Sequence, residues 1–306
     1  MPDIGSYFVY RIIQGVIILL VVSTVVFFVM HVVGDPVRLI LPMEASPEEV
    51  ERVRSLMGLN DPLPTQYGRF LWGAARLDFG LSLWERVPAA DLVLQRLPAT
   101  LLLALSSMAL ALIIAVPAGV IAAVKRGTLF DSMAMVGTFF AQSMPVFWSG
   151  ILLILLFGVK LHLLPTFGYG TPRHLILPVL TLAGYEAARI ARITRSSVLE
   201  VLGQDFIRTA RAKGLHSGRV YFKHALKNAA IPIVAVIGVE YSVLFGGAVI
   251  TETVFAYPGL GSLALRAITY RDFPLVQAAV FVIALNFVVV TWISELLYVW
   301  FNPRYR

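Results

Sequence analysis

The sequence contains no cysteine and few charged residues, and both shortages narrow the class of protein that it can encode. Without Cys the chain cannot form disulfides, thiolate metal sites or a Cys nucleophile. Asp, Glu, Lys and Arg make up 14% of the 306 residues, whereas 58% are hydrophobic. This balance, with a mean hydropathy of +0.80, is typical of a membrane protein with several spans rather than of a water-soluble domain.

Sequence patterns of catalysis and nucleotide binding are also missing. The chain has no GxxxxGK[ST] loop and no HExxH pair, so we predict neither a catalytic nor a metal-binding residue, and no nucleotide-binding loop. Residues 259–264 fit the loose dinucleotide pattern G-x-G-x-x-A, but they follow a long apolar run without a β-α-β context. We therefore interpret them as a turn in an external loop. A membrane-embedded hydrolase is a weak alternative on these grounds.

Long apolar runs are the main positive signal. About 20 apolar residues cross the hydrocarbon core of a bilayer, and five runs reach that length, near 9–33, 99–124, 133–159, 231–255 and 275–301. The first is too long for a signal peptide, so we expect a retained helix. A sixth candidate near 175–199 is weaker, because Pro178 and four charged residues interrupt it.

Charge asymmetry favours the sixth span. From residue 189 to residue 227 there are nine basic and two acidic residues, a balance of +7 that equals the net charge of the whole chain. Short loops rich in Lys and Arg stay in the cytoplasm, so six spans with both termini cytoplasmic satisfy the rule. With five spans the basic loop would share a side with Lys160 and Arg173. The basic balance thus indicates topology, and we expect no nucleic-acid partner.

The expected organisation is an all-α membrane protein in three parts. Residues 1–33 hold the N-terminus and the first span, residues 34–98 form an external helical segment, and residues 99–306 form a core of five spans. In the external segment, Ser46 to Glu49 reads as a capping box and Gly58 as a helix stop. A second helix is predicted to begin at Asp61-Pro62.

Polar residues at membrane depth are the candidates for lining a pathway: Gln142, Ser143, Glu240, Ser242 and Asn286. Such residues are costly in lipid and usually face a cavity or another helix. For Gln142, Ser143 and Asn286, pathway lining and helix-to-helix hydrogen bonding both remain open. For Glu240 we favour a cavity or a partner on another subunit, because a carboxylate seldom faces lipid.

The cytoplasmic loop near 203–228 has the pattern of a docking surface. We predict a helix from Phe206 to Lys213 that Gly214 ends, and a second helical stretch over 220–230 that Pro232 stops. Small and basic side chains suit insertion into a groove of a soluble partner, and the coupling candidates are Arg208, Ala210, Arg211, Ala212, Lys213 and Gly214. Attraction of the loop to anionic lipid headgroups is the alternative.

Several stretches carry a family resemblance that runs essentially end to end. RTARAKGL at 208–215 and HALKNAAIP at 224–232 resemble the cytoplasmic coupling segment of permease subunits of ABC importers, specifically the dipeptide, oligopeptide and nickel class. Further matches to the first of the two permeases in such systems, the one with the longer outer segment, are GDP at 34–36, MGLNDPLPTQY at 57–67, DFGLS at 78–82, RLPAT at 96–100 and ETVFAYPGLG at 252–261. The general importer pattern begins Glu-Ala-Ala, whereas Arg208-Thr209-Ala210 stands here, as in the peptide and nickel branch.

The resemblance implies a non-catalytic transport subunit in a bacterial or archaeal plasma (inner) membrane. It would form half of a pathway for di- or oligopeptides, with membrane lipid around it and a second homologous permease beside it. Two ABC ATPase subunits would bind ATP and Mg, and an external binding protein would deliver cargo. This chain itself would bind no cofactor. Import of nickel or another small solute, an ion-coupled secondary transporter and a membrane scaffold are the alternatives.

Overall fold

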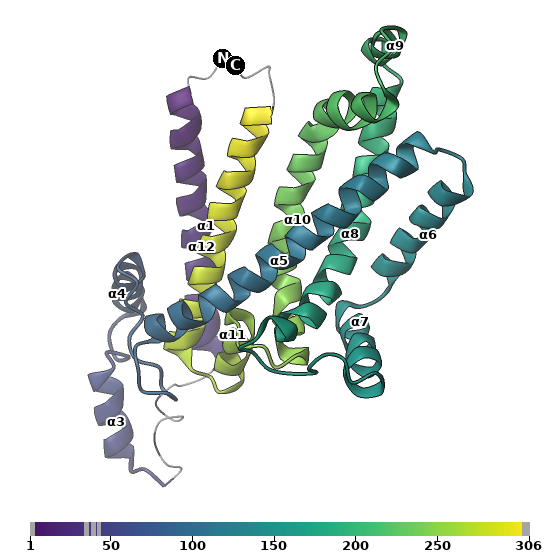
Figure 1. Cartoon of the computed structure of the whole chain (residues 1–306). Coiled ribbons are helices and arrows are strands. Elements are labelled where there is room, and N and C mark those ends of the chain that lie inside the picture. Colours follow the sequence, from purple (N-terminus) through teal and green to yellow (C-terminus); the bar gives the residue numbers. More distant parts are fainter. Residues whose placement is uncertain (1–3, 34–36, 38–40, 42–43, 302–306) are drawn as a thin grey trace. The chain divides into compact units, whose positions relative to one another are not determined.

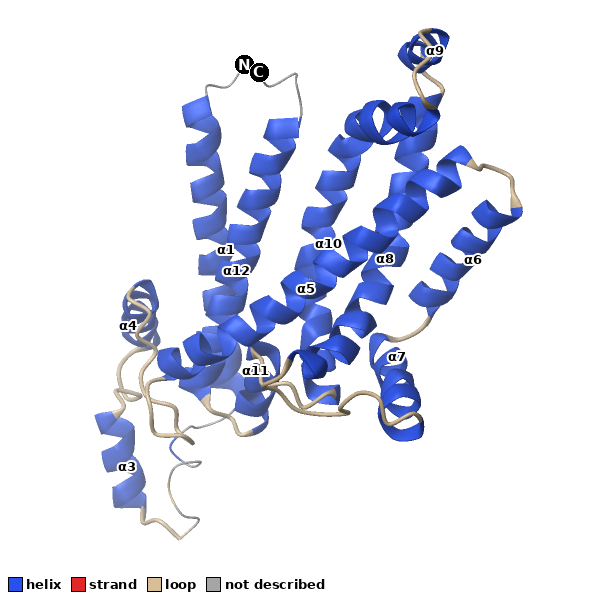
Figure 2. Cartoon of the chain, viewed as in Figure 1, coloured by secondary structure: helices blue, strands red, loops and turns tan. Residues whose placement is uncertain are grey.

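The structure, a computed structural model, describes residues 4–33, 37, 41 and 44–301. Within these residues the chain is helical apart from its connecting loops, and no strand is longer than an isolated bridge between Leu81 and Pro88. Figure 1 traces the helices along the chain and Figure 2 separates helix from loop. The predicted all-α class is confirmed.

Four helices among the described residues are long and apolar enough to cross a membrane. They are α1 (Ile4–Val33), α5 (Ala89–Val124), α10 (Leu226–Val254) and α12 (Phe273–Phe301). Each coincides with one of the predicted apolar runs.

The run predicted as a continuous span over 133–159 is broken, which corrects that prediction. It folds into α6 (Leu129–Ser143), α7 (Val146–Leu153) and a π-helical turn η1 (Ile154–Lys160), with a bend of 101° between the two halves. Pro145 is the cause, because proline disfavours the helical conformation at the residue before it. Met144 accordingly has an extended backbone (φ −82°, ψ 127°). The bent pair can count as a fifth span.

The weak sixth candidate lies within one continuous helix, α8 (Pro172–Leu202). Its first half is apolar and its second half carries the charged residues that interrupt the run. By composition alone α8 is therefore not counted among the spans, although it has 31 residues and is about 46 Å long at 1.5 Å per residue.

The chain divides into two compact units. Unit 1 comprises residues 1–99 and 259–289, and unit 2 comprises residues 100–258 and 290–306. Unit 1 contains the short helices α3 (Pro47–Leu56), α4 (Leu63–Ala75) and α11 (Leu260–Thr269). Unit 2 contains α9 (Asp205–Ala212) and a π-helical turn, η2 (Arg219–Ala225), that leads into α10.

The external segment of unit 1 follows its sequence closely. Ser46 caps α3 and forms the predicted capping box with Glu49, and Gly58 follows the helix with φ +65°. The helix predicted from Asp61-Pro62 begins at Leu63, because Pro62 takes the cap position with an extended backbone. Tyr67 of α4 shares a 2.6 Å hydrogen bond with Thr24 of α1.

Residues 259–264 are not the turn that was predicted, since they begin α11. The helix has a buried stripe at Leu260, Leu263, Ala264 and Ala267, the spacing of one face of an amphipathic helix. This stripe packs into the core of unit 1 with Phe79, Val93 and Leu275.

The core of unit 2 is built around α8, which packs against α6, α7 and α10. A Cβ at Gly119 of α5 would lie 2.6 Å from the carbonyl oxygen of Ala191, so glycine lets α5 approach α8 closely. Pro232 lies inside α10 and does not end the helix as predicted. Proline lacks the N–H that would bond the carbonyl of residue 228, four positions earlier, and that residue is exposed.

Candidate functional site

The coupling candidates lie on α9, a short helix that follows α8 (Figure 1), and on the two residues after it, Lys213 and Gly214. Two of its side chains, Ile207 and Ala210, are buried, and they pack into a cluster with Val120 of α5, Val201 of α8 and Val220 of η2. An apolar face of this kind fixes the short helix to the rest of the unit. The predicted helix over 206–213 is thus confirmed with its ends shifted by one residue.

The other face of α9 is exposed and basic. Arg208, Arg211, Ala212, Lys213 and Gly214 are all exposed. Arg208 has one ionic contact, an exposed pair with Asp205 at 3.4 Å, and the Arg211 guanidinium lies 5.9 Å from the centre of the Tyr221 ring. Exposed pairs of this kind contribute little to stability, so these cations remain available to another protein. Ala210, in contrast, faces inward and packs in the apolar cluster that holds α9.

Gly214 ends α9 through its backbone conformation. Its φ of +74° lies in the left-handed region that glycine adopts without strain. Its N–H donates to the carbonyl of Arg211 at 2.9 Å, and the N–H of Leu215 donates to the carbonyl of Ala210 at 3.4 Å. A Cβ at this position would meet nothing within 4 Å. The backbone angle, and not crowding, is therefore the reason for glycine.

Glu240, the strongest pathway candidate, lies in a buried charged cluster between α10 and α8. Its carboxylate is 3% exposed and pairs with the Arg189 guanidinium at 3.1 Å. Glu186, one turn earlier on α8, is 2% exposed and lies beside Glu240. Two carboxyl groups therefore lie near one guanidinium, and Glu240 is the one that pairs with it. We had favoured a cavity or a partner on another subunit for Glu240, whereas the structure gives it a partner on its own chain, Arg189.

Arg189 belongs to a row of charged residues that entered the sequence analysis only as interruptions of a span and as part of the basic balance. Glu186, Arg189, Arg192 and Arg195 are spaced three apart on α8, which places successive members near one face. We call them the α8 row. Their spacing is the signal that could have identified them, but no pattern in the sequence gives their partners.

The two later members of the α8 row bind α6. Arg192 donates to the Oε1 of Gln142, a neutral amide, and its guanidinium lies 5.6 Å from the centre of the Phe139 ring. Arg195 forms a two-pronged pair with Asp131, at 2.6 Å from Nε and 2.7 Å from Nη2. The Asp131 carboxylate also accepts the N–H of Gly127 at 3.0 Å. Charged side chains thus join α8 to both α10 and α6.

The remaining pathway candidates are not brought to the α8 row by side-chain bonds. Ser143 and Ser242 donate to backbone carbonyls of their own helices, at 2.8 Å and 3.1 Å. Such bonds to the carbonyl four residues earlier satisfy a hydroxyl locally. Asn286 belongs to unit 1, where it is half-buried on α12.

α10 carries a second buried carboxylate, Glu252, near its far end. Glu252 is fully buried and accepts a 2.6 Å hydrogen bond from the Thr100 hydroxyl of α5. In the loop that follows α10, burial, with Tyr169 and Glu252 adding to it, raises the pKa of Tyr257 to about 12. The Tyr257 phenol therefore stays protonated at physiological pH.

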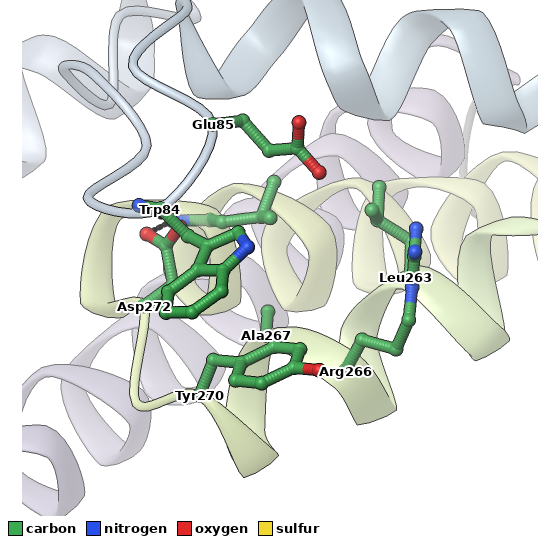
Figure 3. A pocket seen from close by; sticks show the side chains of 8 residues that line it. Trp84, Glu85, Leu263, Arg266, Ala267, Tyr270 and Asp272 are labelled. Atoms are coloured by element: carbon green, nitrogen blue, oxygen red, sulfur yellow. Dashed lines mark hydrogen bonds between the residues drawn. The ribbon is translucent and has the colours of Figure 1, made fainter.

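Unit 1 has a pocket of about 100 Å³ between α11 and the loop before α5. Figure 3 shows Trp84 and Tyr270 stacked, with Glu85 and Arg266 reaching toward the space from different elements. Buried Asp272 supports the loop, because it accepts hydrogen bonds from the Ser82 hydroxyl and from the N–H of Trp84. No sequence pattern had indicated this pocket.

Comparison with known proteins identifies the family. Residues 115–306 match the "Binding-protein-dependent transport system inner membrane component" family, and residues 5–105 match its N-terminal component. The chain belongs to this family. It is 40% identical over 302 residues to the glutathione transport system permease protein GsiC of Escherichia coli (strain K12), which covers 98% of this chain and 99% of the relative. The GsiC protein of Shigella dysenteriae serotype 1 (strain Sd197) gives the same figures.

Solved structures show the same fold. Two structures of inward-facing conformations of the MetNI methionine ABC transporter superpose with TM-scores of 0.56 and 0.57, at 19% and 18% identity. Each match covers 69% of this chain and 97% of the other chain. The expected resemblance to the peptide and nickel class of ABC importer permeases is confirmed. The protein is thus a multi-pass inner-membrane permease subunit, and in such importers the nucleotide is hydrolysed by separate ATPase subunits.

Proposed function

We propose that this chain forms half of the pathway of an ATP-driven importer for di- or oligopeptides. The observation that carries the proposal is the 40% identity, over 98% of the chain, to permeases named for glutathione transport. Glutathione is a tripeptide, so a small peptide is the cargo class that these relatives support. A second homologous permease, two ATPase subunits and an external binding protein would complete the assembly.

The exposed face of α9 is the proposed contact with an ATPase subunit. Its basic side chains, Arg208, Arg211 and Lys213, are free to bind, while Ile207 fixes the helix to the core of unit 2. A helix held in this way transmits a displacement to α8 and α10. When ATP closes the two ATPases, the motion would pass through α9 and switch the spans between inward-facing and outward-facing states.

We further propose six spans, with both termini cytoplasmic. α8 is the span added to the five apolar runs. Charged residues inside a membrane pair with one another or face a cavity. Arg189 and Arg195 of the α8 row pair with the carboxylates of Glu240 and Asp131, and Arg192 donates to the neutral amide of Gln142. This pairing lets α8 span despite its low hydropathy. The external segment 34–98 and the core 99–306 keep their predicted places in this topology.

The pathway wall is proposed to include Gln142 and Glu240, each of which contacts an arginine of the α8 row. Arg192 strengthens this assignment, because its partner is a neutral amide and its positive charge remains uncompensated within the pair. A cationic wall suits cargo that carries carboxylates. Ser143, Ser242 and Asn286 stay as lining candidates through their positions on α6, α10 and α12.

Reconstituted transport tests the function directly. The chain would be purified with its co-expressed partners, the partners identified, and the assembly placed in liposomes with its binding protein. We expect uptake of labelled glutathione or of a labelled dipeptide only when ATP is present on the side of the membrane where the ATPase subunits lie. Uptake driven by a proton gradient without ATP would contradict the proposal. ATP-driven uptake of a nickel chelate, with no uptake of peptide, would keep the importer function but change its assigned cargo to nickel.

The absence of Cys makes the topology easy to test. Single cysteines at Lys160 and Arg208 would be labelled with a membrane-impermeant maleimide in intact cells and in inverted vesicles. Six spans place Lys160 outside and Arg208 inside, so only the first should react in intact cells. Reaction of both positions from the same side would support five spans instead.

A further inference from the structure

The pocket in unit 1 has the composition of a protein-binding hot spot. Trp, Tyr and Arg dominate the binding energy of protein interfaces, typically around a well-packed pocket. Here Trp84 is 66% exposed and Tyr270 is 51% exposed, and their rings stack with centroids 4.7 Å apart and an interplanar angle of 10°. Arg266 of α11 stands at the edge of the same pocket, whose floor is apolar (Figure 3).

The aromatic platform is held rigidly from below. Asp272 is 1% exposed, and its carboxylate binds the Ser82 hydroxyl, the N–H of Trp84 and the N–H of Leu275 at the start of α12. The Ser82 hydroxyl also accepts the N–H of Glu85 at 3.0 Å. These bonds fix the loop that carries Trp84, and a preorganised surface loses little entropy when a partner binds.

The charges around the pocket select the sign of the partner. Arg86 and Arg271 follow the pocket-lining residues along the chain, and both are exposed, as is Arg266. Glu85 is the exposed carboxylate among the pocket-lining residues, and in the part of the chain that the structure describes neither Glu85 nor Arg266 has a side-chain partner. Counted against Glu85 and the buried Asp272, Arg266 and the two neighbouring arginines leave a balance of +1 around the pocket, and complementarity then favours an acidic partner surface.

We propose that this pocket, with Trp84, Tyr270 and Arg266, is the docking socket for an acidic loop of the external binding protein. The inference rests on the proposed function, which places the loop before α5 and α11 on the outer side. A carboxylate of the binding protein would pair with the Arg266 guanidinium while its neighbouring side chain covers the Trp84 ring. Arg86 and Arg271 would steer the approach.

The test is the affinity of the assembled importer, in lipid nanodiscs, for the purified binding protein of the same importer loaded with glutathione. We expect Arg266→Glu to raise the concentration needed for half-maximal binding at least tenfold, and Trp84→Ala to raise it severalfold. Arg266→Lys should stay close to the unaltered protein. The matched control is Arg52→Glu, which makes the same charge change on exposed α3, away from the pocket, and should shift binding less than twofold.

Three outcomes would overturn the inference. If the importer with Arg266→Glu binds the binding protein as tightly as the unaltered importer does, the pocket is not the docking socket. If Arg52→Glu weakens binding as much as Arg266→Glu does, the effect is long-range electrostatic attraction and not contact at the pocket. A lower yield of membrane-inserted importer for Trp84→Ala and Trp84→Phe, with unchanged affinity in the fraction that assembles, would assign the aromatic pair to lipid. Failure of the proposed function is distinguishable, because the unaltered importer would then bind no binding protein at all.

Discussion

Arginines three apart occur on both α8 and α9, but the two helices use them in opposite ways. On α8 each guanidinium meets a side chain from another helix, such as Asp131 at 2.6 Å for Arg195. On α9, Arg208 and Arg211 are exposed, and the apolar side chains beneath them hold the helix. Charge on α8 therefore joins parts of one chain, whereas charge on α9 is available to another chain. Four predictions sharpen this contrast.

The largest loss of stability is expected from Asp131→Ala. The change removes the two-pronged partner of Arg195 and the acceptor of the Gly127 N–H. The Asp131 side chain is 7% exposed and that of Arg195 is 24% exposed, so removing one member of this partly buried pair is expected to cost about 3–4 kcal/mol, toward the lower end of the range for a buried pair. The midpoint of thermal unfolding in detergent should fall clearly, and adding Arg195→Leu should restore most of it. Equal midpoints for Asp131→Ala and the unaltered protein would show that the pair is not structural.

Ile207→Ala is expected to cost somewhat less. Ile207 is fully buried beneath α9, and truncation of a buried Ile to Ala costs about 3 kcal/mol. Because the cavity lies under α9, proteolysis near residue 213 should also become faster. Thr209→Ala on the exposed side of the same helix is the matched control and should change neither measurement. If the control behaves like Ile207→Ala, α9 is not held by its apolar face.

Gly214→Ala should have a smaller effect that depends on the backbone alone. A side chain at φ +74° costs about 1–2 kcal/mol, although there is space for it. Gly214→Asn should cost less, because Asn tolerates the left-handed region better. The same thermal measurement ranks the variants, and a larger loss for Asn than for Ala would indicate a contact that the backbone argument omits.

Arg208→Glu with Arg211→Glu should have the smallest effect on stability. Both side chains are exposed, and surface substitutions usually change stability by about 0.5 kcal/mol or less. Comparing the stability loss of this variant with that of Asp131→Ala distinguishes charged residues that stabilise the fold from charged residues that do not. A loss comparable to that of Asp131→Ala would abolish the distinction between the two helices.

Local signals in the sequence were sufficient for much of the fold. The capping box at Ser46, the bounds of α9 and the stop at Gly214 depend on interactions within a few residues, so they could be predicted. The break at Pro145 was visible too, but the apolar run around it suggested continuity. For Pro232 the opposite error arose, because one lost hydrogen bond at an exposed turn does not end a long helix.

Contacts between distant segments could not be predicted in the same way. Arg192 and Gln142 are far apart in the sequence, and their pairing depends on how α6 packs against α8. The same holds for Asp272 and Ser82, which organise the pocket of unit 1. Composition indicated that Glu240 would avoid lipid, yet its partner, Arg189, became apparent only in the fold.

The central claim is that α9 couples this permease to an ATPase, and ATP hydrolysis by the assembled importer tests it most directly. Hydrolysis would be measured with and without the loaded binding protein for Arg208→Glu/Arg211→Glu and for Lys125→Glu/Arg126→Glu, a control that makes the same charge change at two exposed basic residues of the loop before α6. We predict that the α9 variant loses at least nine tenths of the stimulated activity while the control keeps it. Full stimulation in the α9 variant would contradict the account.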